Sequence, residues 1–323
     1  MRLSIVMATW MGERYLREQL DSFARQKRLP DELVVRDDGS TDSTLQIVRD
    51  FARRASFDVK ILATGPRLGF GRNFGEALVA ATGDLIFLSD QDDVWLSDKL
   101  QRIEQLASER TDALLFVNDL ENVGPELQRT DVTTLGNIRQ VGLSDSTHIA
   151  GCATAVRRSL LAFALPLPRN EASHDGWLHV CAETFGRRVV VPEVLQLYRR
   201  HDTNTSDWAP TRTGRMSFVK LYQESLRNDR LRSHRLQLVR EKDLLQRLTE
   251  ADAVTLETLC RDRAAAFGRV ERRVAALEGR VGVLTTPWPG RWRVALRMWM
   301  RGGYDDFIGW RSMVSDLLST SKG

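Results

Sequence analysis

The chain has few cysteines and lacks the apolar runs and glycine signatures that mark several large protein classes. Its 323 residues include only three cysteines, an odd number without CxxC spacing, so a disulfide scaffold and a zinc knuckle are excluded and a reducing compartment is expected. Nowhere do about 18 uncharged apolar residues follow one another, which excludes a membrane-spanning helix. The apolar stretch at the N-terminus is too short for a signal-peptide core. No P-loop signature occurs, which argues against a P-loop nucleotidase.

The composition predicts a folded chain with two regions of opposite charge. Hydrophobic residues make up 42% and charged residues 28%, which favours a packed core over disorder. From residue 210 onward there are 22 Lys and Arg against 13 Asp and Glu, whereas residues 1–209 carry 25 basic and 30 acidic residues. An acidic front and a basic tail indicate regions with different partners.

The first 210 residues alternate between strand and helix patterns. Four short apolar runs predict strands, and segments with helical spacing separate them; the strands are expected at Leu3–Ala8, Glu32–Arg36, Val59–Leu62 and Asp84–Leu88. This order predicts an α/β domain, residues 1–210, with a mainly parallel sheet covered by helices on both faces. Ligands of such sheets bind beyond the carboxyl ends of the strands.

Residues 211–323 form the second predicted region. From Thr213 to Gly282 there is no proline, and Arg, Leu, Glu and Ala are abundant. This composition favours helices, so a basic α-helical C-terminal region is expected.

Acidic side chains follow two of the predicted strands. Asp90, Asp92 and Asp93 come directly after Leu88, and three carboxylates this close together favour a cation such as Mg²⁺ or Mn²⁺. Asp37 and Asp38 end an earlier strand, where a carboxylate can accept hydrogen bonds from a nucleobase or a ribose. For both groups the alternative is an ordinary turn or helix cap.

Three further segments carry polar groups suited to a charged ligand. The loop that starts at Gly69 can bring Arg72 to a phosphate. Asp175 precedes Trp177, and an aromatic neighbour can raise a carboxyl pKa by desolvation and make the group a base; a helix start is the alternative. The segment Tyr198–Asn204 combines two arginines with a histidine, which suits a diphosphate or a metal.

Taken in chain order, these segments closely resemble family 2 glycosyltransferases. The resemblance covers about residues 1–208 and rests on the following stretches: Ala8–Trp10, Asp37–Thr44, Gly69–Asn73, Phe87–Trp95, His174–Trp177 and Tyr198–His201. Ser89–Trp95 together with His174 and Asp175 is most similar to the bacterial rhamnosyltransferase-like branch. The resemblance implies a GT-A fold and transfer of a sugar from a nucleoside diphosphate with inversion at the anomeric carbon.

The resemblance also implies which residues bind the donor. Thr9 and Asp38 match positions that hold the base and ribose, Asp37 matches the neighbouring position, and Arg72 matches a basic position near the nucleotide. Asp90 would face the ribose. The remaining matches concern the diphosphate and its divalent ion, Mg²⁺ or Mn²⁺. Asp92 and His201 would be metal ligands, and Arg199 and Arg200 would assist in binding the diphosphate.

For the acceptor side, Asp175 matches the general base that deprotonates the attacking hydroxyl. Trp177 either stacks on an acceptor sugar or packs in the core. Two departures from the family pattern affect the pockets. Gly176 stands where relatives often carry a bulky residue, and Trp10–Gly12 replaces a common Tyr-Asn pair.

The expected activity is transfer of L-rhamnose from dTDP-rhamnose to a hydroxyl of a bacterial cell-envelope glycan or a lipid-linked acceptor. A UDP-hexose donor is the alternative within the family. A sugar-1-phosphate nucleotidyltransferase would need a glycine- and lysine-rich signature that Leu3–Glu13 lacks. A non-catalytic membrane-surface scaffold is a further alternative, against which the intact Asp38, Asp92 and Asp175 argue.

The end of the chain interleaves tryptophan and arginine. Between Pro287 and Arg301 there are three tryptophans and four arginines. On a helix, Trp292, Ala295, Leu296 and Trp299 share a face, which suits reversible binding to an anionic membrane from the cytoplasmic side. Packing against the catalytic domain or a second subunit of a homodimer is the alternative. We expect a cytoplasmic protein at the inner face of the cell membrane, without a nucleic-acid partner.

Overall fold

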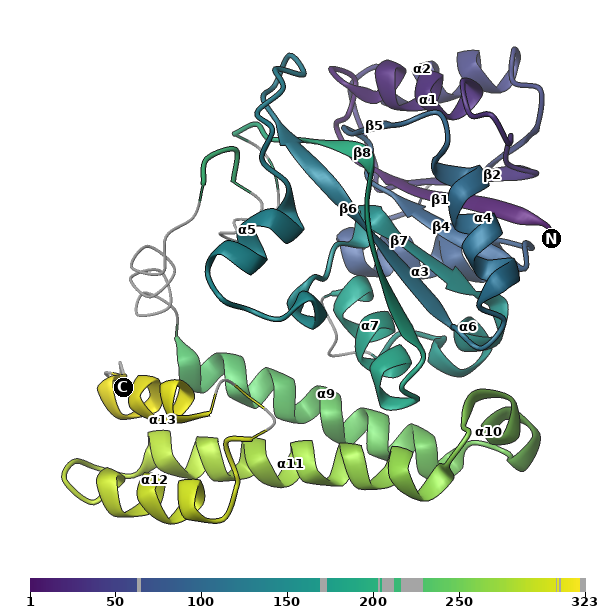
Figure 1. The fold of residues 1–323 in the computed structure, drawn as a ribbon. Coiled ribbons are helices and arrows are strands. Elements are labelled where there is room, and N and C mark those ends of the chain that lie inside the picture. The colour runs from purple at the N-terminus through teal and green to yellow at the C-terminus, as the bar shows by residue number, and fades with distance from the viewer. Residues whose placement is uncertain are drawn as a thin grey trace. The chain divides into compact units, whose positions relative to one another are not determined.

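The structure, a computed structural model, describes residues 1–62, 65–168, 173–202, 204, 212–215, 229–305, 307 and 309–319. The chain divides into two compact units, Met1–Ser217 and Phe218–Gly323 (Figure 1). The boundary predicted at residue 210 lies outside the described residues.

The first unit follows the alternating order that the sequence predicts. Its strands are β1 Leu3–Thr9, β2 Glu32–Asp37, β3 Asp58–Ile61, β4 Leu85–Ser89, β5 Val94–Trp95, β6 Leu115–Val123, β7 Thr154–Arg157 and β8 Arg188–Arg199. Its helices are α1 Leu16–Ala24, α2 Thr44–Ala52, α3 Phe70–Ala80, α4 Lys99–Glu109, α5 Thr134–Gln140, α6 Arg158–Ala164 and α7 His174–Thr184, with short 3-10 turns η1 Asp145–Thr147 and η2 Gly151–Ala153. The four predicted strands are confirmed to within two residues at each end.

The described strands form one eight-stranded sheet in the order β3-β2-β1-β4-β7-β6-β8-β5. The four predicted strands are parallel neighbours. Beyond them the sheet is mixed, because β7 runs antiparallel to β4 and β6, β8 is parallel to β6, and β5 is antiparallel to β8. The prediction of a mainly parallel sheet is confirmed, and the antiparallel strands are additions that the sequence did not reveal.

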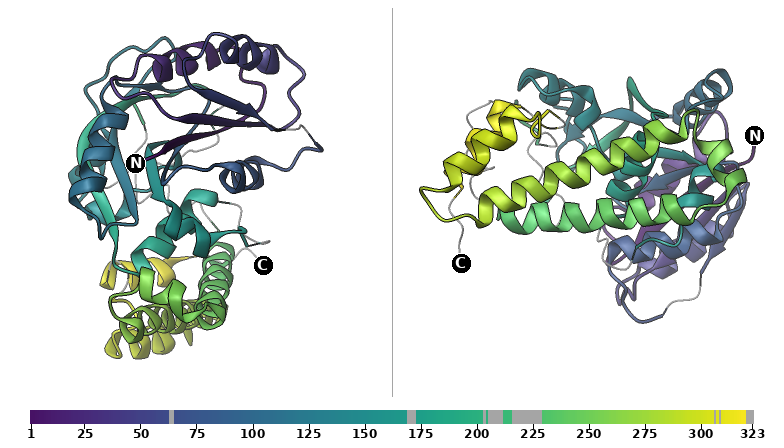
Figure 2. Two further views of the ribbon diagram at one scale, coloured as in Figure 1. Left: turned by 90° about the vertical axis from the view of Figure 1, so that its right-hand side faces the viewer. Right: turned by 90° about the horizontal axis from the view of Figure 1, so that it is seen from below.

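Helices cover both faces of this sheet. Alternate residues of β1 point to opposite faces, and Leu3, Ile5 and Met7 pack with Leu16 and Phe23 of α1 in one buried core. On the opposite face α3 contacts β1 and β2. The left view of Figure 2 shows the purple helices α1 and α2 on one side of the strands and the blue α3 on the other.

The second unit is helical, as predicted. Its helices are α9 Arg230–Glu250, α10 Ala253–Leu259, α11 Arg263–Thr285, α12 Arg291–Met300 and α13 Trp310–Leu318. Aspartates begin three of them by accepting a backbone hydrogen bond three residues on: Asp229 from Arg232 (3.0 Å), Asp252 from Thr255 (2.8 Å) and Asp262 from Ala265 (2.9 Å).

The helices of the second unit are held by a small core and by ion pairs. The long helices α9 and α11 lie side by side (Figure 1), with ion pairs between Arg273 and Glu241 (2.9 Å) and between Lys242 and Glu278 (2.7 Å). Val283, Ala295 and Leu317 form the core between α11, α12 and α13. Among the described residues, no helix combines the length and the apolar character needed to cross a bilayer.

Candidate active site

Polar residues from three strands meet at the carboxyl edge of the parallel part of the sheet. The register places Thr9 of β1 beside Asp37 of β2 and Met7 beside Ser89 of β4. The pair Asp37–Asp38 and the acids that follow Ser89 therefore leave the sheet at the same edge, as the strand pattern predicts. This is the edge where open α/β sheets bind ligands.

Thr9 and Asp37 are joined to each other and are fully buried. The Thr9 hydroxyl donates to Asp37 Oδ1 at 2.8 Å, and the carboxylate also accepts from the Ser40 amide (2.7 Å), the Ser40 hydroxyl (2.6 Å) and the Gly39 amide (3.1 Å). Three of these four donors come from the turn after Asp37 and the fourth from Thr9 on β1, so the lone pairs of the carboxylate are in use. The geometry therefore gives Asp37 the turn-forming role, and Thr9 the role of fixing it.

Asp38 connects β2 to the loop before α3. Its two carboxylate oxygens accept from the backbone amides of Leu68 (2.7 Å) and Gly69 (2.9 Å). Gly69 has φ +81°, a conformation that favours glycine, and α3 begins at the next residue. Arg72 consequently lies in the first turn of α3, with an exposed side chain at this edge. The structure thus brings Asp38 and the Arg72 segment together, and their contact with a nucleotide stays a prediction.

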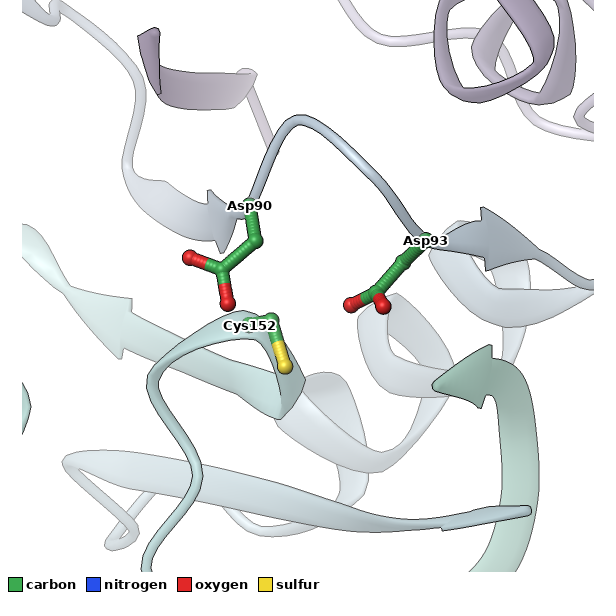
Figure 3. A group of neighbouring side chains, drawn as sticks. All are labelled: Asp90, Asp93 and Cys152. Atoms are coloured by element: carbon green, nitrogen blue, oxygen red, sulfur yellow. The ribbon is translucent and has the colours of Figure 1, made fainter. Parts of the chain in front are cut away.

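A buried group of two carboxyls and a thiol follows β4. The donor atoms of Asp90, Asp93 and Cys152 all lie within 4.8 Å of one another, and Figure 3 shows Asp90 and Asp93 on one loop with Cys152 on a separate segment. Burial, and next the charges of Asp92 and Asp175, raise the pKa of Asp90 to about 7. Burial and the nearby acids also raise the pKa of the Cys152 thiol. Protonation of Asp90 and of the Cys152 thiol therefore lowers the number of negative charges in this group.

Lys99 is the cation of this group, and sequence reasoning missed it. Its ammonium donates to the Cys152 carbonyl at 3.0 Å and to Gln196, and it lies 3.9 Å from the centre of the Trp95 ring. Burial lowers the pKa of Lys99 to about 7, and Cys152 and Asp93 oppose that shift. A lone lysine at the start of a helix gives no sequence signal for this position, because the partner residues lie far along the chain.

Asp93 binds interior partners and does not cap a helix. Its carboxylate accepts from the Gln196 side chain and the Arg199 amide, both at 3.1 Å, and it is fully buried. The cap residue before α4 is Asp98. The donor atoms of the group are close enough to hold a cation, but a protonated thiol beside a lysine is a poor ligand. We therefore interpret Asp93 and Cys152 as the support of the site, and the contact of Asp90 with a ribose stays a prediction.

Asp92 and His201 form the better metal-binding pair. Although 109 positions separate them, His201 Nε2 lies 2.8 Å from Asp92 Oδ2, and both side chains keep some exposure, 10% and 16%. The His201 ring also packs against Tyr15, with centroids 4.9 Å apart. A carboxylate oxygen and an imidazole nitrogen are ligands that Mn²⁺ accepts. The donor set fits the predicted ion, whose binding stays a prediction.

Asp175 lies in the first turn of α7 and is held in place by that turn. Its Oδ1 accepts from the Ser173 hydroxyl and from the Gly176 amide (2.8 Å), and Ser173 is the N-cap of the helix. A Cβ on Gly151 would lie 3.3 Å from Asp175 Oδ2, so η2 packs closely against the carboxylate. The turn η2 therefore lies between the two acids, because Gly151 contacts Asp175 and the neighbouring Cys152 has its donor atom within 4.8 Å of that of Asp90.

The charge state of Asp175 corrects one sequence-based expectation. Burial raises its pKa, but His174 and the Ser173 hydrogen bond outweigh burial and hold the pKa of Asp175 below the ordinary value. The expected increase from an aromatic neighbour is wrong. Asp175 is ionised at neutral pH, which is the form a general base needs.

Trp177 lies in the core and not at an acceptor surface. It is fully buried, and its indole Nε1 donates to the Ala164 carbonyl at 2.8 Å. Nine of the eleven residues of α7 are buried, so this helix is covered on nearly every side. The acceptor-side role of Trp177 is therefore wrong, and the packing alternative is correct.

Arg199 is also an interior residue. Its side chain is 1% exposed and donates to the Asp92 carbonyl at 2.8 Å, to the Pro125 carbonyl and to Glu18. With these partners it fixes the Asp92 loop and does not offer its guanidinium to a diphosphate, which corrects its donor-binding role. Arg200 is partly exposed, and its amide donates to Val123 at 2.9 Å. Its role toward the diphosphate stays a prediction.

His174 is a buried neighbour of Asp175 that sequence reasoning quoted without a role. Its ring stacks on Phe74, with centroids 3.9 Å apart, and is 4% exposed. Neither ring nitrogen has a hydrogen-bond partner within the described part of the chain. Burial lowers the pKa of His174, and the charge of Asp175 opposes this shift. Its position next to Asp175 links it to the base through charge rather than through a hydrogen bond.

His179 makes the first unit sensitive to acid. Its Nδ1 accepts from Arg188 Nε at 2.8 Å, and its Nε2 lies 2.8 Å from the Thr154 hydroxyl. Burial, and next the Arg188 charge, lower the pKa of His179 well below its usual range. The unfolded chain takes up a proton near pH 6.5 and the folded chain does not, so stability falls as the pH drops through 6.5.

We expect His179→Gln to reduce this acid sensitivity. Between pH 6.5 and 5.5 the wild type should lose about 1 kcal/mol more unfolding free energy than the variant, because glutamine does not titrate. Urea unfolding of both proteins across this pH range measures the difference. Titrating groups that do not interact with His179 are common to the two proteins and cancel, whereas Asp175, His148 and His174 interact with it electrostatically. Equal pH slopes would contradict the assignment.

Comparison with known proteins agrees with this geometry. The model of the family "Glycosyl transferase family 2" matches residues 4–162. The dTDP-rhamnosyl transferase RfbG of Shigella flexneri is 36% identical over 216 residues, which are 61% of this chain and 72% of the relative. The chain belongs to glycosyl transferase family 2. An uncharacterized protein of Mycobacterium tuberculosis is 28% identical over 205 residues, 62% of this chain and 59% of the relative's length.

Solved structures show that this family member has the GT-A fold. Staphylococcus aureus TarS 1-349 in complex with UDP-GlcNAc superposes with a TM-score of 0.54 at 18% identity, covering 98% of this chain and 89% of that one. The mannosyltransferase PcManGT of Pyrobaculum calidifontis, solved with GDP-Man and Mn²⁺, has a TM-score of 0.53 at 15% identity, covering 98% and 86%. At this identity the likeness concerns the fold alone.

Proposed function

We propose that this family 2 member transfers a sugar from a nucleoside-diphosphate donor to a hydroxyl of a cell-envelope glycan or lipid-linked acceptor, with inversion. The observation that carries the proposal is the convergence of the turn-held Asp175 with Asp90, through η2, and with the Asp92–His201 pair. A base and a site for a leaving diphosphate are the two parts that such a transfer requires.

Asp175 would remove the proton from the acceptor hydroxyl. As that oxygen forms its bond to the anomeric carbon, the bond from this carbon to the diphosphate breaks on the opposite side, which inverts the configuration. The proton ends on Asp175, and the electron pair leaves with the nucleoside diphosphate. Because Ser173 and Gly176 hold one carboxylate oxygen, the other is the oxygen that receives the proton.

Asp92 and His201 would hold the divalent ion, Mg²⁺ or Mn²⁺, whose Lewis acidity stabilises the negative charge of the departing diphosphate. Arg199 supports this pair by binding the Asp92 carbonyl from the interior. Lys99, Asp93 and Cys152 pack against the interior side of the loop between β4 and β5. The donor-side residues on this loop are therefore held in place by buried neighbours.

We further propose dTDP-L-rhamnose as the donor. The similarity to a protein named a dTDP-rhamnosyl transferase supports it, and this relative matches over most of its own length. A UDP-hexose donor is the second candidate, since TarS, with the same fold, was solved with UDP-GlcNAc. Family membership gives no support to the nucleotidyltransferase alternative.

A thermal-shift panel distinguishes these donors. The purified chain is heated with dTDP-rhamnose, UDP-GlcNAc, UDP-glucose and GDP-mannose, each with and without Mn²⁺. A donor at 100 times its Kd adds about 2.7 kcal/mol to the unfolding free energy. We expect the largest Mn²⁺-dependent shift with dTDP-rhamnose. A larger shift with a UDP-sugar would transfer the proposal to that donor, and no shift with any nucleotide sugar would contradict the proposed function.

A further inference from the structure

Helix α12 buries one side and presents large apolar side chains on the other. Ala295 is fully buried against Val283 and Leu317. The exposed side carries residues that soluble proteins usually cover: Trp288 (60% exposed), Trp292 (51%), Leu296 (47%), Trp299 (46%) and Met300 (69%). Among the described residues of the second unit, the core of that unit leaves these tryptophans exposed. The sequence placed Ala295 on the exposed face of this helix, and that prediction is wrong because Ala295 is buried in the core of the second unit.

These side chains form one patch, here called the α12 patch. The rings of Trp288 and Trp292 lie with centroids 6.0 Å apart, which joins the segment before the helix to its first turn. Trp292, Leu296, Trp299 and Met300 then follow at spacings of four, three and one, within one sector of the helix. The patch therefore extends along the whole length of α12.

Arginines line one border of the α12 patch. Arg293, Arg297 and Arg301 follow at intervals of four residues, so they stack on one flank of the helix, and all three are exposed. None of the three has an ion-pair partner within the described residues. No acidic residue occurs between Glu278 and Asp305. The border of the patch thus carries positive charge without local compensation.

Neighbouring arginines show that this exposure is selective. Arg291 is buried and donates to the carbonyls of Thr286 (3.2 Å), Leu284 (3.0 Å) and Ser319. Arg280 binds the buried Asp316 through two bonds of 2.8 Å. The arginines on the inner side of α12 and on α11 therefore hold the unit together. Those on the outer side have no such structural role.

We propose that the α12 patch binds this chain to the surface of an anionic lipid bilayer. Tryptophan prefers the interface between water and hydrocarbon, and an exposed apolar sector flanked by cations is typical of helices that lie in that plane. Each arginine near an anionic surface adds about fivefold to the affinity. A second copy of the chain fits less well, because a twofold contact with antiparallel α12 helices would place the arginines of one patch against those of the other.

The inference goes beyond the proposed sugar transfer and does not depend on it. Co-sedimentation of the full chain with phosphatidylcholine vesicles, with and without 30% phosphatidylglycerol, tests it. We expect binding to the anionic vesicles only, with strong weakening when salt is raised from about 0.1 M to 0.5 M. Point variants are preferable to truncation, because Ala295 and Leu317 belong to the core of the second unit.

Two variants separate the contributions of charge and tryptophan. The triple change R293Q, R297Q and R301Q should weaken binding about 100-fold, and W292S with W299S should abolish it. The matched control R232Q, R235Q and R272Q removes the same charge from exposed positions on α9 and α11 and should lose far less. Donor binding measured by thermal shift should stay at the wild-type level in all three.

Three outcomes would overturn the inference. One is failure of the wild type to bind anionic vesicles. Another is equal weakening by the control and the α12 arginine variant, which would indicate dependence on net charge alone. The third is dimerisation of the wild type without vesicles that W292S with W299S abolishes, together with unchanged vesicle binding. That result would assign the patch to a second copy of the chain.

Discussion

Replacement of Asp175 by asparagine is expected to lower the rate of sugar transfer by about 100- to 10,000-fold while leaving donor affinity unchanged. The amide keeps the size of the carboxylate, and its oxygen can still accept from Ser173 and Gly176. It cannot accept a proton from the acceptor hydroxyl. Product formation gives the rate, and calorimetric titration with the nucleotide sugar gives the affinity.

The pH profile of the wild type tests the same assignment. A base acts in its ionised form, so the rate falls as the pH drops through the pKa of Asp175. Because His174 and Ser173 hold that pKa below the ordinary carboxyl value despite burial, the acid limb due to Asp175 should lie below the range of an ordinary aspartate.

Asp145→Asn is the matched control for Asp175→Asn. Asp145 pairs with Arg139 at 2.7 Å on the surface of the first unit, and its loss should leave the rate at the wild-type level. A collapse of donor affinity in Asp175→Asn would show that the residue binds the donor. Transfer within threefold of wild type would show that it is not the base.

Replacement of Asp92 by alanine is expected to abolish the metal-dependent part of the activity, a loss of about 100-fold or more, without unfolding the chain. Asp92 is partly exposed, and its side chain bonds to His201. Its backbone carbonyl still accepts from Arg199 in the variant, so the loop keeps its interior support. Turnover at increasing Mn²⁺ concentration and the Mn²⁺-induced thermal shift are the measurements.

His201→Ala should lose Mn²⁺ affinity in parallel, since it supplies the other ligand. Asp58→Ala, which removes an exposed carboxylate at the edge strand β3, should retain both the turnover and the Mn²⁺ response. Wild-type turnover in Asp92→Ala would refute the metal-binding role. Loss of cooperative unfolding in that variant would instead show that Asp92 is structural.

The sequence predicted the local part of the site well. Runs of alternating and apolar residues identify β1, β2 and β4, and the acids that follow them leave parallel strands at one edge for geometric reasons. The helical second unit follows from a long segment without proline. These features depend on residues near one another in the chain, where periodicity and turn chemistry are readable.

Side-chain environment was harder to predict, as Trp177 and Arg199 show. An aromatic residue beside an acid looks the same in sequence whether its ring faces a ligand or the core. Because α7 is covered on nearly every side, its periodicity does not reveal a solvent face. Arg199 ends a strand whose partners come from distant segments, and only their approach turns its guanidinium inward.

The sequence by itself determined the family, the order of the first strands and the identity of Asp90, Asp92 and Asp175 as the acids of interest. The tertiary structure decided which residues meet. It brings His201 to Asp92 and packs η2 against Asp175. It also places Lys99 and Cys152 beside Asp90 and Asp93, and buries Ala295 in the core of the second unit. The physical reason is that these contacts join segments far apart in the chain. Burial and charge at each position depend on neighbours that no local pattern specifies.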